Sequence, residues 1–280
     1  MIVLNGKLVS EEIQLTLKNK VDKLIDLGII PCLSVILVGD NFDSIKYVNA
    51  KRKVCETLNI EFHLIHFNKD VSEGQILESI DILNKDNDIH GILVQLPLPS
   101  HIDKFMIMDR VLPSKDVDGF HLINSGKLYL NRKKDFVPCT PLGCIELLDH
   151  YNIPIKGTHT VIIGSSQVVG LPLSMMLLQR GATVTLCNIN TVNIQEHTKR
   201  ADILISCCGV PQLVKEEWVK EGVIIIDVGI NLQDGKLVGD VDYEGVKGKS
   251  KYITPVPGGV GPMTIAMLVK QVIRSAEASL

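Results

Sequence analysis

Helix-like and strand-like patterns of apolar residues alternate along the chain. Between residues 13 and 24, apolar side chains recur every three or four positions behind an acidic pair at 11–12, which predicts a first helix that stops at Gly28. Residues 32–38 form a short, almost continuous apolar run, typical of a strand buried in a parallel sheet. The same reasoning predicts helices at about 44–58 and after a capping box at 72–75, and strands at 61–67 and 91–96. Strands that alternate with helices imply right-handed βαβ units around a parallel sheet.

A second alternating series follows a polar, basic interval at residues 131–135. Thr140 and Pro141 have the character of an N-cap and the first residue of a helix, and Pro262 opens a last helix that runs to the C-terminus. Between them the pattern predicts strands at 160–163, 182–186, 202–206 and 223–227, and an Asp-Gly hairpin within 231–237. The predicted fold class is therefore α/β: two α/β domains, of which the second is a Rossmann-like, doubly wound parallel sheet.

Composition narrows the classes of partner. The chain has 280 residues, of which 45% are hydrophobic and 22% charged, so it is long enough for about two folded domains. Its formal net charge of −3 gives no basic field, and we expect a small-molecule ligand and no nucleic-acid partner. The mean hydropathy of +0.22 is high, but the longest nearly apolar stretch, 168–178, is far shorter than the ~20 residues of a membrane span. Because no secretory signal is visible either, we expect no membrane partner and a cytoplasmic location.

The spacing of cysteine and histidine gives no sign of a metal site. The seven cysteines are odd in number, two of them are adjacent at 207–208, and none forms a C-x-x-C pair. The eight histidines include no H-E-x-x-H arrangement. We therefore expect buried free thiols and no metal.

A strand that ends in Gly164 leads into a helix, which is the context of a dinucleotide-binding turn. Gly164, Ser165 and Ser166 are the candidate contacts of a cofactor pyrophosphate. The glycine pattern is incomplete, because Ser166 and Val169 occupy the second and third glycine positions of G-x-G-x-x-G, and a purely structural turn explains it equally well. The next strand ends in residues 187–191 (CNINT), which offer neither an acid for a ribose hydroxyl nor an arginine for a 2′-phosphate, so NAD and NADP both remain open.

Ser44, Tyr47 and Lys51 are spaced i, i+3 and i+7, which places them on one face of a helix. On spacing alone a solvated polar face is the better explanation. Gln95 and Asp118 favour a site instead, because they belong to the sheet edge at which open α/β folds bind ligands. A lysine in an apolar cleft has a lowered pKa and can act as acid or base near neutrality, with Gln95 to orient it. Tyr47 can stack on a flat ring, and Asp118 can accept hydrogen bonds from an aminopyrimidine.

Residues 254–262 (TPVPGGVGP) combine rigid and permissive backbone just before the last helix. Such a run is usually a turn, but three glycines within four residues also let a flat ligand approach the backbone closely. Asp240 and Asp242 could suggest a cation site, yet two carboxylates alone favour a structural role.

Six segments together resemble the bifunctional methylenetetrahydrofolate dehydrogenase/methenyltetrahydrofolate cyclohydrolase family over nearly the whole chain. They are residues 38–40 (VGD) with Ser44, Tyr47 and Lys51; 91–99 (GILVQLPLP); 115–119 (KDVDG); 138–141 (PCTP); 227–231 (DVGIN); and 255–264 (PVPGGVGPMT). One such segment would be a weak match, whereas six in the family's order are highly specific.

The resemblance implies a folate-binding catalytic domain of residues 1–138 plus 265–280, a Rossmann dinucleotide-binding domain of 139–264, and a cleft between them. It implies a homodimeric enzyme that oxidises 5,10-methylenetetrahydrofolate to the 5,10-methenyl form by hydride transfer to NADP and then hydrolyses it to 10-formyltetrahydrofolate. The implied catalytic residues are Lys51, Tyr47, Gln95 and Asp118, the substrate contacts are Ser44, Tyr47, Pro257, Gly258 and Gly259, and the cofactor contacts are Gly164, Ser165, Ser166 and Ile230.

Two departures from the family pattern bear on the cofactor. The family's Gly-Arg-Ser turn has Ser165 in place of arginine here, and its Cys-His-Ser-x-Thr reads CNINT at 187–191, so residues that can hold a 2′-phosphate are replaced. NADP is the expected cofactor, and NAD is the second possibility.

Three different functions compete with the bifunctional one. They are an enzyme with one of the two activities, a catalytically silent nucleotide-binding protein, and a short-chain dehydrogenase, whose Y-x-x-x-K motif matches Tyr47 and Lys51. Short-chain dehydrogenases carry that motif after the dinucleotide turn, whereas here it comes before Gly164, which argues against them.

Overall fold

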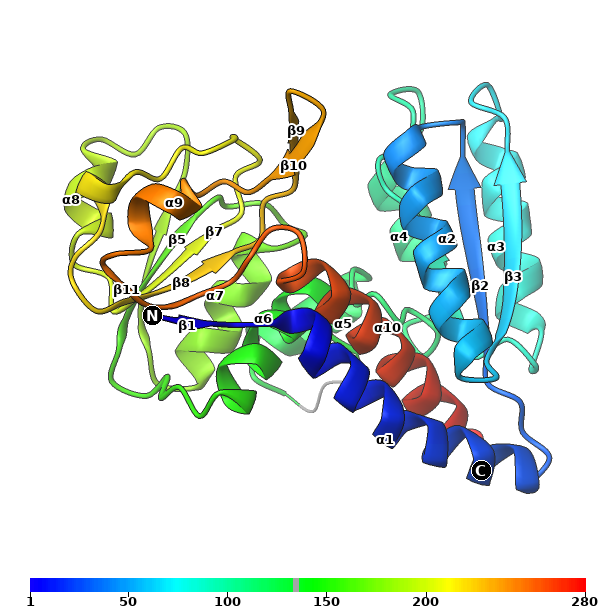
Figure 1. Cartoon of the computed structure of the whole chain (residues 1–280). Helices are drawn as coiled ribbons and strands as arrows, with labels where there is room; N and C mark the ends of the chain where they lie inside the picture. Colours follow the sequence, from blue (N-terminus) through cyan, green and yellow to red (C-terminus); the bar gives the residue numbers. More distant parts are fainter. Residues whose placement is uncertain (133–135) are drawn as a thin grey trace. The chain divides into compact units, whose positions relative to one another are not determined.

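The computed structural model describes residues 1–132 and 136–280 (Figure 1), so residues 133–135 of the predicted polar interval lie outside the described residues. The chain divides into two compact units. Unit 1 comprises Met1–Glu11 and Thr140–Thr264, and unit 2 comprises Glu12–Cys139 and Ile265–Leu280. Across the two described ranges, no helix is both long enough and apolar enough to cross a membrane.

Unit 1 is built on a six-stranded parallel sheet in the order β1-β11-β8-β7-β5-β6. The strands are β1 (Ile2–Val3), β5 (His159–Ile163), β6 (Thr183–Cys187), β7 (Ile203–Ser206), β8 (Val223–Asp227) and β11 (Ser250–Ile253). The chain passes from β5 to β6 and then returns across β5 to β7, so the order reverses between β5 and β7, as in a doubly wound, Rossmann-like sheet. Open α/β sheets bind ligands at such a reversal, beyond the carboxyl ends of the strands.

Helices and one hairpin complete unit 1. They are α6 (Cys139–His150), α7 (Gly170–Gln179), α8 (Ile194–Thr198), α9 (Tyr243–Val246), the 3₁₀ turn Glu216–Trp218, and the strands β9 (Asn231–Gln233) and β10 (Lys236–Val238). The predicted Asp-Gly hairpin is confirmed, because β9 and β10 pair antiparallel and both Asp234 and Gly235 have positive φ, as its tight turn requires.

Unit 2 contains a three-stranded parallel sheet in the order β3-β2-β4. Its elements are β2 (Cys32–Val38), α2 (Phe42–Thr57), β3 (Glu61–Phe67), α3 (Glu73–Lys85), β4 (Gly91–Val94), α4 (Lys104–Arg110) and α5 (Leu122–Tyr129). All seven residues of the central strand β2 are buried. On one face of the sheet Ile36 packs in a single apolar cluster with Ile76 and Ile80 of α3 and Ile107 of α4, which forms the core there.

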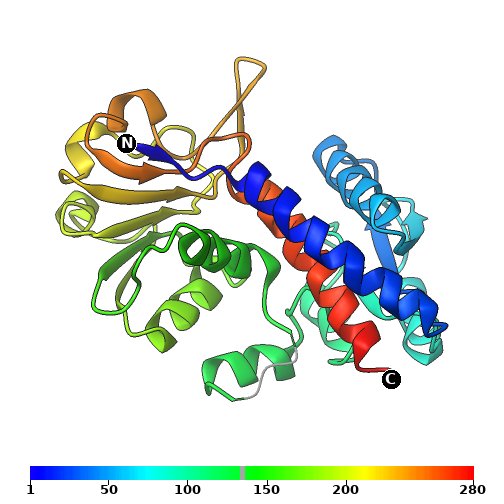
Figure 2. The same ribbon diagram turned by 60° about the horizontal axis from the view of Figure 1, so that its bottom comes forward.

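Two long helices, α1 (Gly6–Asp26) and α10 (Val260–Glu277), each contain residues of both units. Their unit 2 portions run side by side (Figure 2), and Lys20 Nζ lies 2.9 Å from Glu277 Oε1. Both helices are amphipathic, and the apolar side chains that they bury help to close the core of unit 2.

The predicted strands at 32–38, 61–67 and 223–227 and the Ser72–Gln75 capping box are confirmed. Three helix starts are wrong. Helix α1 begins before the acidic pair at 11–12, because the Asn5 side chain accepts a 3.1 Å hydrogen bond from the Leu8 N–H and caps an earlier turn. Helix α6 begins at Cys139, so the predicted N-cap Thr140 lies inside it, and α10 begins at Val260, ahead of Pro262.

Strand β1 and helices α4 and α5 are not predicted by the sequence pattern. β1 has only two residues and therefore no periodicity, and it forms by pairing with β11. This pairing groups Met1–Glu11 with unit 1 rather than with the expected folate domain. Helices α4 and α5 are too short for a clear apolar repeat.

Candidate active site

Helix α2 presents two of the predicted side chains to the interior of unit 2. It begins after the carboxyl end of β2, where the Asn41 side chain accepts a 3.0 Å hydrogen bond from the Ser44 N–H and caps the first turn. Ser44 and Lys51 are buried, and Tyr47 between them is half-buried. The explanation of this stripe as a solvated polar face is therefore wrong for Ser44 and Lys51.

Lys51 and Gln95 are joined by a direct hydrogen bond. Lys51 Nζ donates a 2.8 Å hydrogen bond to Gln95 Oε1, and Gln95 Nε2 donates a 2.7 Å hydrogen bond to the Leu96 carbonyl. A flip of the Gln95 side-chain amide would lose both hydrogen bonds. The Gln95 N–H is itself held by the Ile36 carbonyl of β2 at 2.9 Å. Lys51 Nζ also lies 5.5 Å from the centre of the Tyr47 ring, within the range of a cation–π contact. The amine is thus oriented by two uncharged side chains.

Asp118 is the charged partner of this lysine. Lys51 is only 4% exposed, and burial lowers the pKa of its amine, while the negative charge of Asp118 opposes that shift. Burial also raises the pKa of the Asp118 carboxyl, and the charge of Lys51 and hydrogen bonds from Cys139 oppose the rise. A buried lysine of lowered pKa can accept and return a proton near neutrality, where an exposed lysine stays protonated.

The segment around Asp118 is fixed on both sides. Lys115 Nζ donates to two carbonyls at the end of α3, at 2.9 and 3.0 Å. The Asp116 carboxylate accepts hydrogen bonds of 2.9 Å from a backbone N–H and 2.8 Å from a side-chain amide of α5, and burial raises its pKa to about 7. At Gly119, where φ is +73°, an added Cβ would lie 2.4 Å from the carbonyl carbon of Val137. These contacts leave the Asp118 loop little freedom.

Two residues of this group, Cys139 and Gln271, are not among those predicted from the sequence. The Cys139 thiol donates a 3.3 Å hydrogen bond to the Val117 carbonyl, next to Asp118, and accepts one from Gln271 Nε2 at 3.3 Å. Cys139 stands within the segment 138–141 that carries the family resemblance, but nothing in the sequence assigns its thiol a role. Gln271 is an uncharged polar residue on the apolar face of a helix, which is the one sequence signal that could have identified it. A buried amide at such a position must have hydrogen-bond partners, because leaving it unpaired is unfavourable.

In unit 1 the predicted dinucleotide turn is shaped by two close backbone approaches. Gly164 directly follows β5 and has a φ of +113°, and a Cβ there would lie 2.5 Å from the Cys207 carbonyl oxygen. A Cβ at Gly170 would lie 1.8 Å from the Gly164 carbonyl oxygen. The close helix-to-strand packing that the third glycine of a dinucleotide fingerprint provides is therefore supplied by Gly170, one residue after Val169. Glycine at both positions lets the strand-to-helix turn fold this tightly, which is the backbone geometry of a pyrophosphate-binding turn.

The other predicted cofactor contacts lie on exposed loops of unit 1. Ser165 is half-buried, and the exposed Ser166 accepts a 3.2 Å hydrogen bond from the Val169 N–H. Ile230 is 50% exposed on the loop after β8. After β6, Ile189 is 99% exposed.

Two buried carboxylates hold the loop that carries Ile230. Asp227 accepts hydrogen bonds from the N–H groups of Gly229 and Asp240 at 3.1 and 3.0 Å, and burial raises its pKa to about 7. Asp240 accepts from Asn231 Nδ2 at 2.9 Å and from the Cys208 N–H at 2.8 Å. The structural role expected for Asp240 is thus confirmed by its contacts.

The predicted site residues fall into two groups, one in each unit. Unit 2 contains Ser44, Tyr47, Lys51, Gln95 and Asp118, and unit 1 contains Gly164, Ser165, Ser166, Ile230, Pro257, Gly258 and Gly259. Within unit 1, Gly258 has a φ of +104° and its carbonyl accepts a 3.0 Å hydrogen bond from the Lys7 N–H at the start of α1. A Cβ at Gly6 would lie 1.9 Å from the Gly259 carbonyl oxygen, so the glycine loop and α1 meet backbone to backbone.

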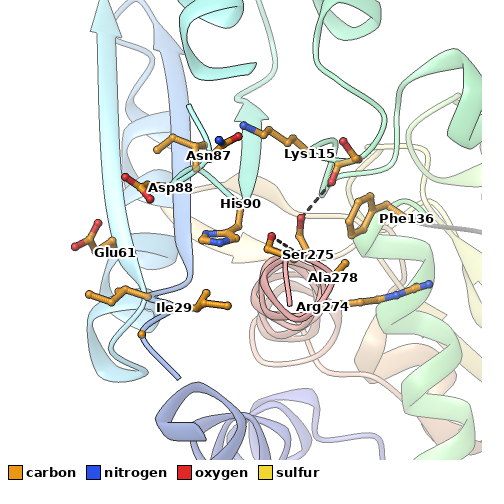
Figure 3. Close-up of a pocket in the computed structure, with 15 residues that line it drawn as sticks. Ile29, Glu61, Asn87, Asp88, His90, Lys115, Phe136, Arg274, Ser275 and Ala278 are labelled. Carbon is orange, nitrogen blue, oxygen red and sulfur yellow. Dashed lines mark hydrogen bonds between the residues drawn. The ribbon is translucent and has the colours of Figure 1, made fainter. Parts of the chain in front are cut away.

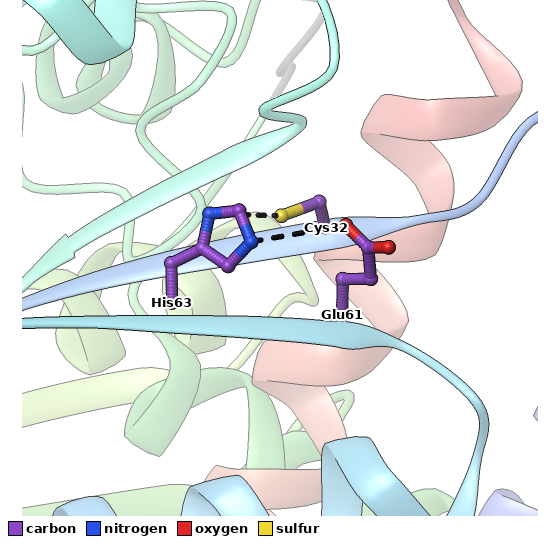
Figure 4. A group of neighbouring side chains, drawn as sticks. All are labelled: Cys32, Glu61 and His63. Atoms are coloured by element: carbon purple, nitrogen blue, oxygen red, sulfur yellow. Dashed lines mark hydrogen bonds and ion pairs between the residues drawn. The ribbon is translucent and has the colours of Figure 1, made fainter.

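Two further features of unit 2 lie where its strands begin, whereas Gln95 follows the carboxyl end of β4. A cavity of about 950 Å³ is lined by His90, Lys115 and Arg274, among others (Figure 3). Cys32, Glu61 and His63 gather on neighbouring strands (Figure 4), with their donor atoms within 4.8 Å of one another. His63 turns Nδ1 toward the Cys32 thiol at 3.9 Å and Nε2 toward Glu61 at 3.8 Å, and burial raises the pKa of that thiol to about 12. Each of these side chains could offer one ligand atom to a metal ion, a grouping that the spacing of cysteine and histidine in the sequence does not predict.

Comparison with known proteins is consistent across sequence and structure. The catalytic-domain model of the tetrahydrofolate dehydrogenase/cyclohydrolase family matches residues 4–118, and its NAD(P)-binding-domain model matches residues 138–280. The bifunctional protein FolD of Campylobacter jejuni is 51% identical over 278 residues, which cover 99% of each chain.

Solved structures agree with these matches. The crystal structure of the Campylobacter jejuni bifunctional enzyme FolD superposes with a TM-score of 0.99 at 50% identity over the full length of both chains. The Trypanosoma brucei methylenetetrahydrofolate dehydrogenase-cyclohydrolase, solved with NADP cofactor and an inhibitor, superposes with a TM-score of 0.96 at 35% identity over 100% of this chain and 98% of that one. Together with the family models, these matches show that the chain belongs to the tetrahydrofolate dehydrogenase/cyclohydrolase family.

Proposed function

We propose that this chain oxidises 5,10-methylenetetrahydrofolate to 5,10-methenyltetrahydrofolate by hydride transfer to NADP and then hydrolyses the product to 10-formyltetrahydrofolate. The observation that carries the proposal is the buried Lys51 amine, held 2.8 Å from Gln95 Oε1 with Asp118 as its charged partner. Such an amine suits the proton transfers of the hydrolytic step, and family membership supports the choice of substrate.

In the first step the methylene carbon between N5 and N10 loses a hydride and becomes the methenyl cation. The nitrogen lone pairs stabilise the cation, so the step needs orientation of the substrate more than an acid or a base. The Gly164–Ser166 turn and Ile230 would hold NADP, which would supply the hydride acceptor when bound. Gly164 and Gly170 support this assignment, since the space that a Cβ would take at each is left to backbone.

In the second step a water molecule adds to the methenyl carbon and loses a proton, and the bond from that carbon to N5 then breaks while N5 gains a proton. Lys51 in its neutral form accepts the proton from water and returns it to N5, and Gln95 and Tyr47 keep the amine in place. As the bond to N5 breaks, the remaining hydroxyl proton is lost to solvent and the carbon–oxygen bond becomes the formyl carbonyl, so the products are 10-formyltetrahydrofolate and one proton.

Ser44, Asp118, Pro257, Gly258 and Gly259 complete the proposal as contacts of the folate. Asp118 is suited to the amino and ring N–H groups of the pterin, which are hydrogen-bond donors. Unit 2 supplies the folate-binding residues 44–118 and unit 1 the dinucleotide turn. A homodimer and a cytoplasmic location belong to the same proposal; β3, which pairs with β2 and with no other described strand, offers an edge at which two copies could meet.

A second candidate, use of NAD as well as NADP, is favoured by one observation. The loop after β6 carries Ile189 at 99% exposure, and none of residues 188–191 has a basic side chain that could pair with a 2′-phosphate.

The test is to measure initial rates with methylenetetrahydrofolate and either NADP or NAD, followed by the decay of the methenyl product. Turnover with NADP and decay faster than the uncatalysed reaction are expected. No turnover with either cofactor would refute the dehydrogenase activity, and uncatalysed decay would refute the cyclohydrolase activity. Sedimentation of the purified protein tests the dimer.

A further inference from the structure

We propose that Gln271 is a positioning residue for proton transfer by Lys51. Its side-chain amide holds Cys139 and the backbone on both sides of Asp118, and so places the Asp118 carboxyl near Lys51. The inference rests on the proposed function, since the reaction supplies its readout. Gln271 is not offered as a catalytic residue, because it acts through other side chains.

The amide of Gln271 joins two separate segments of unit 2, residues 117–119 and residues 137–139. Gln271 lies on α10 and is 3% exposed. Its Oε1 accepts a 3.0 Å hydrogen bond from the Val137 N–H, and its Nε2 lies 2.6 Å from the Val117 carbonyl, 3.0 Å from the Val137 carbonyl and 3.3 Å from Cys139 Sγ. Every polar atom of this buried side chain therefore has a partner, and each partner belongs to one of the two segments.

The two segments are packed so closely that a movement of one must displace the other. Cys139 Sγ lies 3.3 Å from the Val117 carbonyl oxygen, which Gln271 also contacts. A Cβ at Gly119 would come within 2.4 Å of Val137 and 2.7 Å of Pro138 N, so no side chain fits between them. Because Asp118 stands between Val117 and Gly119, its carboxyl is placed by contacts that Gln271 completes.

The charges near Lys51 connect this placement to proton transfer. The Tyr47 ring and the Gln95 amide contact the amine, and the nearby groups whose charge acts on its pKa are the Asp118 carboxyl and the thiols of Cys139 and Cys55. Burial raises the pKa of Cys55 to about 12 and that of Cys139 well above its usual value, so both thiols stay neutral and Asp118 is the group whose charge can change. Hydrogen bonds from Cys139 lower the pKa of Asp118, and the Asp118 charge raises the pKa of Lys51.

Removal of the Gln271 amide should lower the pKa of Lys51. Loss of the Gln271 amide releases Cys139, and weaker hydrogen bonds from Cys139 raise the pKa of Asp118. A carboxyl that is less ionised supports the Lys51 ammonium less, so the pKa of Lys51 falls further. The limb of the pH–rate profile that reports Lys51 therefore moves to lower pH.

The experiment compares wild-type protein with Gln271→Met, which has nearly the same length and no amide, and with Gln271→Asn, which keeps an amide on a shorter side chain. Ser275→Ala is the matched control: it lies one turn further along α10 and loses a 3.1 Å hydrogen bond to another backbone carbonyl, that of Ser114. The readouts are the rate of methenyltetrahydrofolate hydrolysis against pH, kcat and KM separately, and the melting temperature.

We expect Gln271→Met to shift the Lys51 limb to lower pH and to lower kcat by roughly 10- to 100-fold, with a smaller shift in Gln271→Asn and none in Ser275→Ala. If Gln271→Met does not fold, the profile of Gln271→Asn decides alone. A melting temperature that falls while the variants keep the wild-type profile would overturn the proposal and leave Gln271 a merely structural residue. Failure of the proposed function is recognised separately, because wild-type protein would then show no hydrolysis at any pH.

Discussion

The cofactor turn makes a quantitative prediction for Gly170→Ala. The added Cβ would lie 1.8 Å from the Gly164 carbonyl oxygen, 2.8 Å from its carbonyl carbon and 3.2 Å from Ser165 Cα. Real Cβ atoms essentially never approach closer than 3.0 Å, so the start of α7 and the end of β5 must separate by more than 1 Å (3.0 minus 1.8). All three neighbouring atoms are backbone, which cannot rotate away as a flexible side chain would.

This displacement should lower both the stability of the protein and its affinity for NADP. Overpacking of this kind destabilises a protein by about 1–3 kcal/mol. Because the atoms displaced are those of the turn assigned to the pyrophosphate, we also expect NADP binding to weaken at least tenfold, which is about 1.4 kcal/mol, and kcat to fall by up to ~100-fold for a 1 Å misplacement.

The assay is NADP binding by isothermal titration calorimetry, together with the melting temperature and initial rates. Gly248→Ala is the control, because a Cβ there meets nothing within 4 Å and its backbone is not in the left-handed region. NADP affinity within twofold of wild type in Gly170→Ala would contradict the assignment of the turn, even if the variant were less stable. Equal losses in both variants would show that the effect is unspecific.

Three further predictions concern other parts of the molecule. Gln95→Met removes the acceptor of Lys51 Nζ, and we expect hydrolysis of methenyltetrahydrofolate to slow by roughly 10²-fold while NADP affinity is unchanged; a wild-type rate would contradict its orienting role. Because burial raises the pKa of Asp227 to about 7, the folded state binds more protons than the unfolded chain between about pH 4 and pH 7, so the free energy of unfolding falls as pH rises through that window, by at most about 1.4 kcal/mol per pH unit for this group. Chemical denaturation at several pH values gives the free energy of unfolding as a function of pH. Its decrease with rising pH should be smaller in Asp227→Asn than in wild type and unchanged in the exposed control Asp234→Asn. The same pH dependence in all three proteins would refute the raised pKa of Asp227. Ser165→Arg is expected to raise the ratio of kcat/KM for NADP over NAD by about tenfold or more, and Ser165→Gln, which adds length without charge, should leave the ratio near that of wild type.

The parts of the fold that repeat a strong local pattern could be predicted from the sequence. Strand β2 is buried over its whole length and reads as a continuous apolar run, and the Ser72–Gln75 box satisfies the first turn of α3 with its own side chains. Both signals lie within the segment that they describe. The start of α1 is different, because it depends on a cap at Asn5 and on close contact between Gly6 and Gly259 in a loop far along the chain.

The candidate site shows the same division. The spacing of Ser44, Tyr47 and Lys51 predicts one helix face, but whether that face is buried depends on how unit 2 packs around it. Gly170 was hidden by a spacing one residue longer than the usual glycine fingerprint, and the Gly164 contact that reveals it is tertiary. Gln271 stands out in the sequence only as a polar residue on the apolar face of the last helix, and its hydrogen-bond partners are backbone atoms that residue types do not reveal.

The most direct test of the central claim is the rate of methenyltetrahydrofolate hydrolysis by Lys51→Met, with Lys53→Met, exposed on the same helix, as the control. Loss of a positioned general acid–base is expected to lower kcat about 10²–10⁴-fold. Methionine leaves Gln95 Oε1 and the Asp118 carboxyl without their partner, so the melting temperature is measured to show that the variant is folded, and Lys53→Met should match wild type in both measurements. A folded Lys51→Met protein that hydrolyses the methenyl compound at close to the wild-type rate would show that Lys51 does not carry the proton.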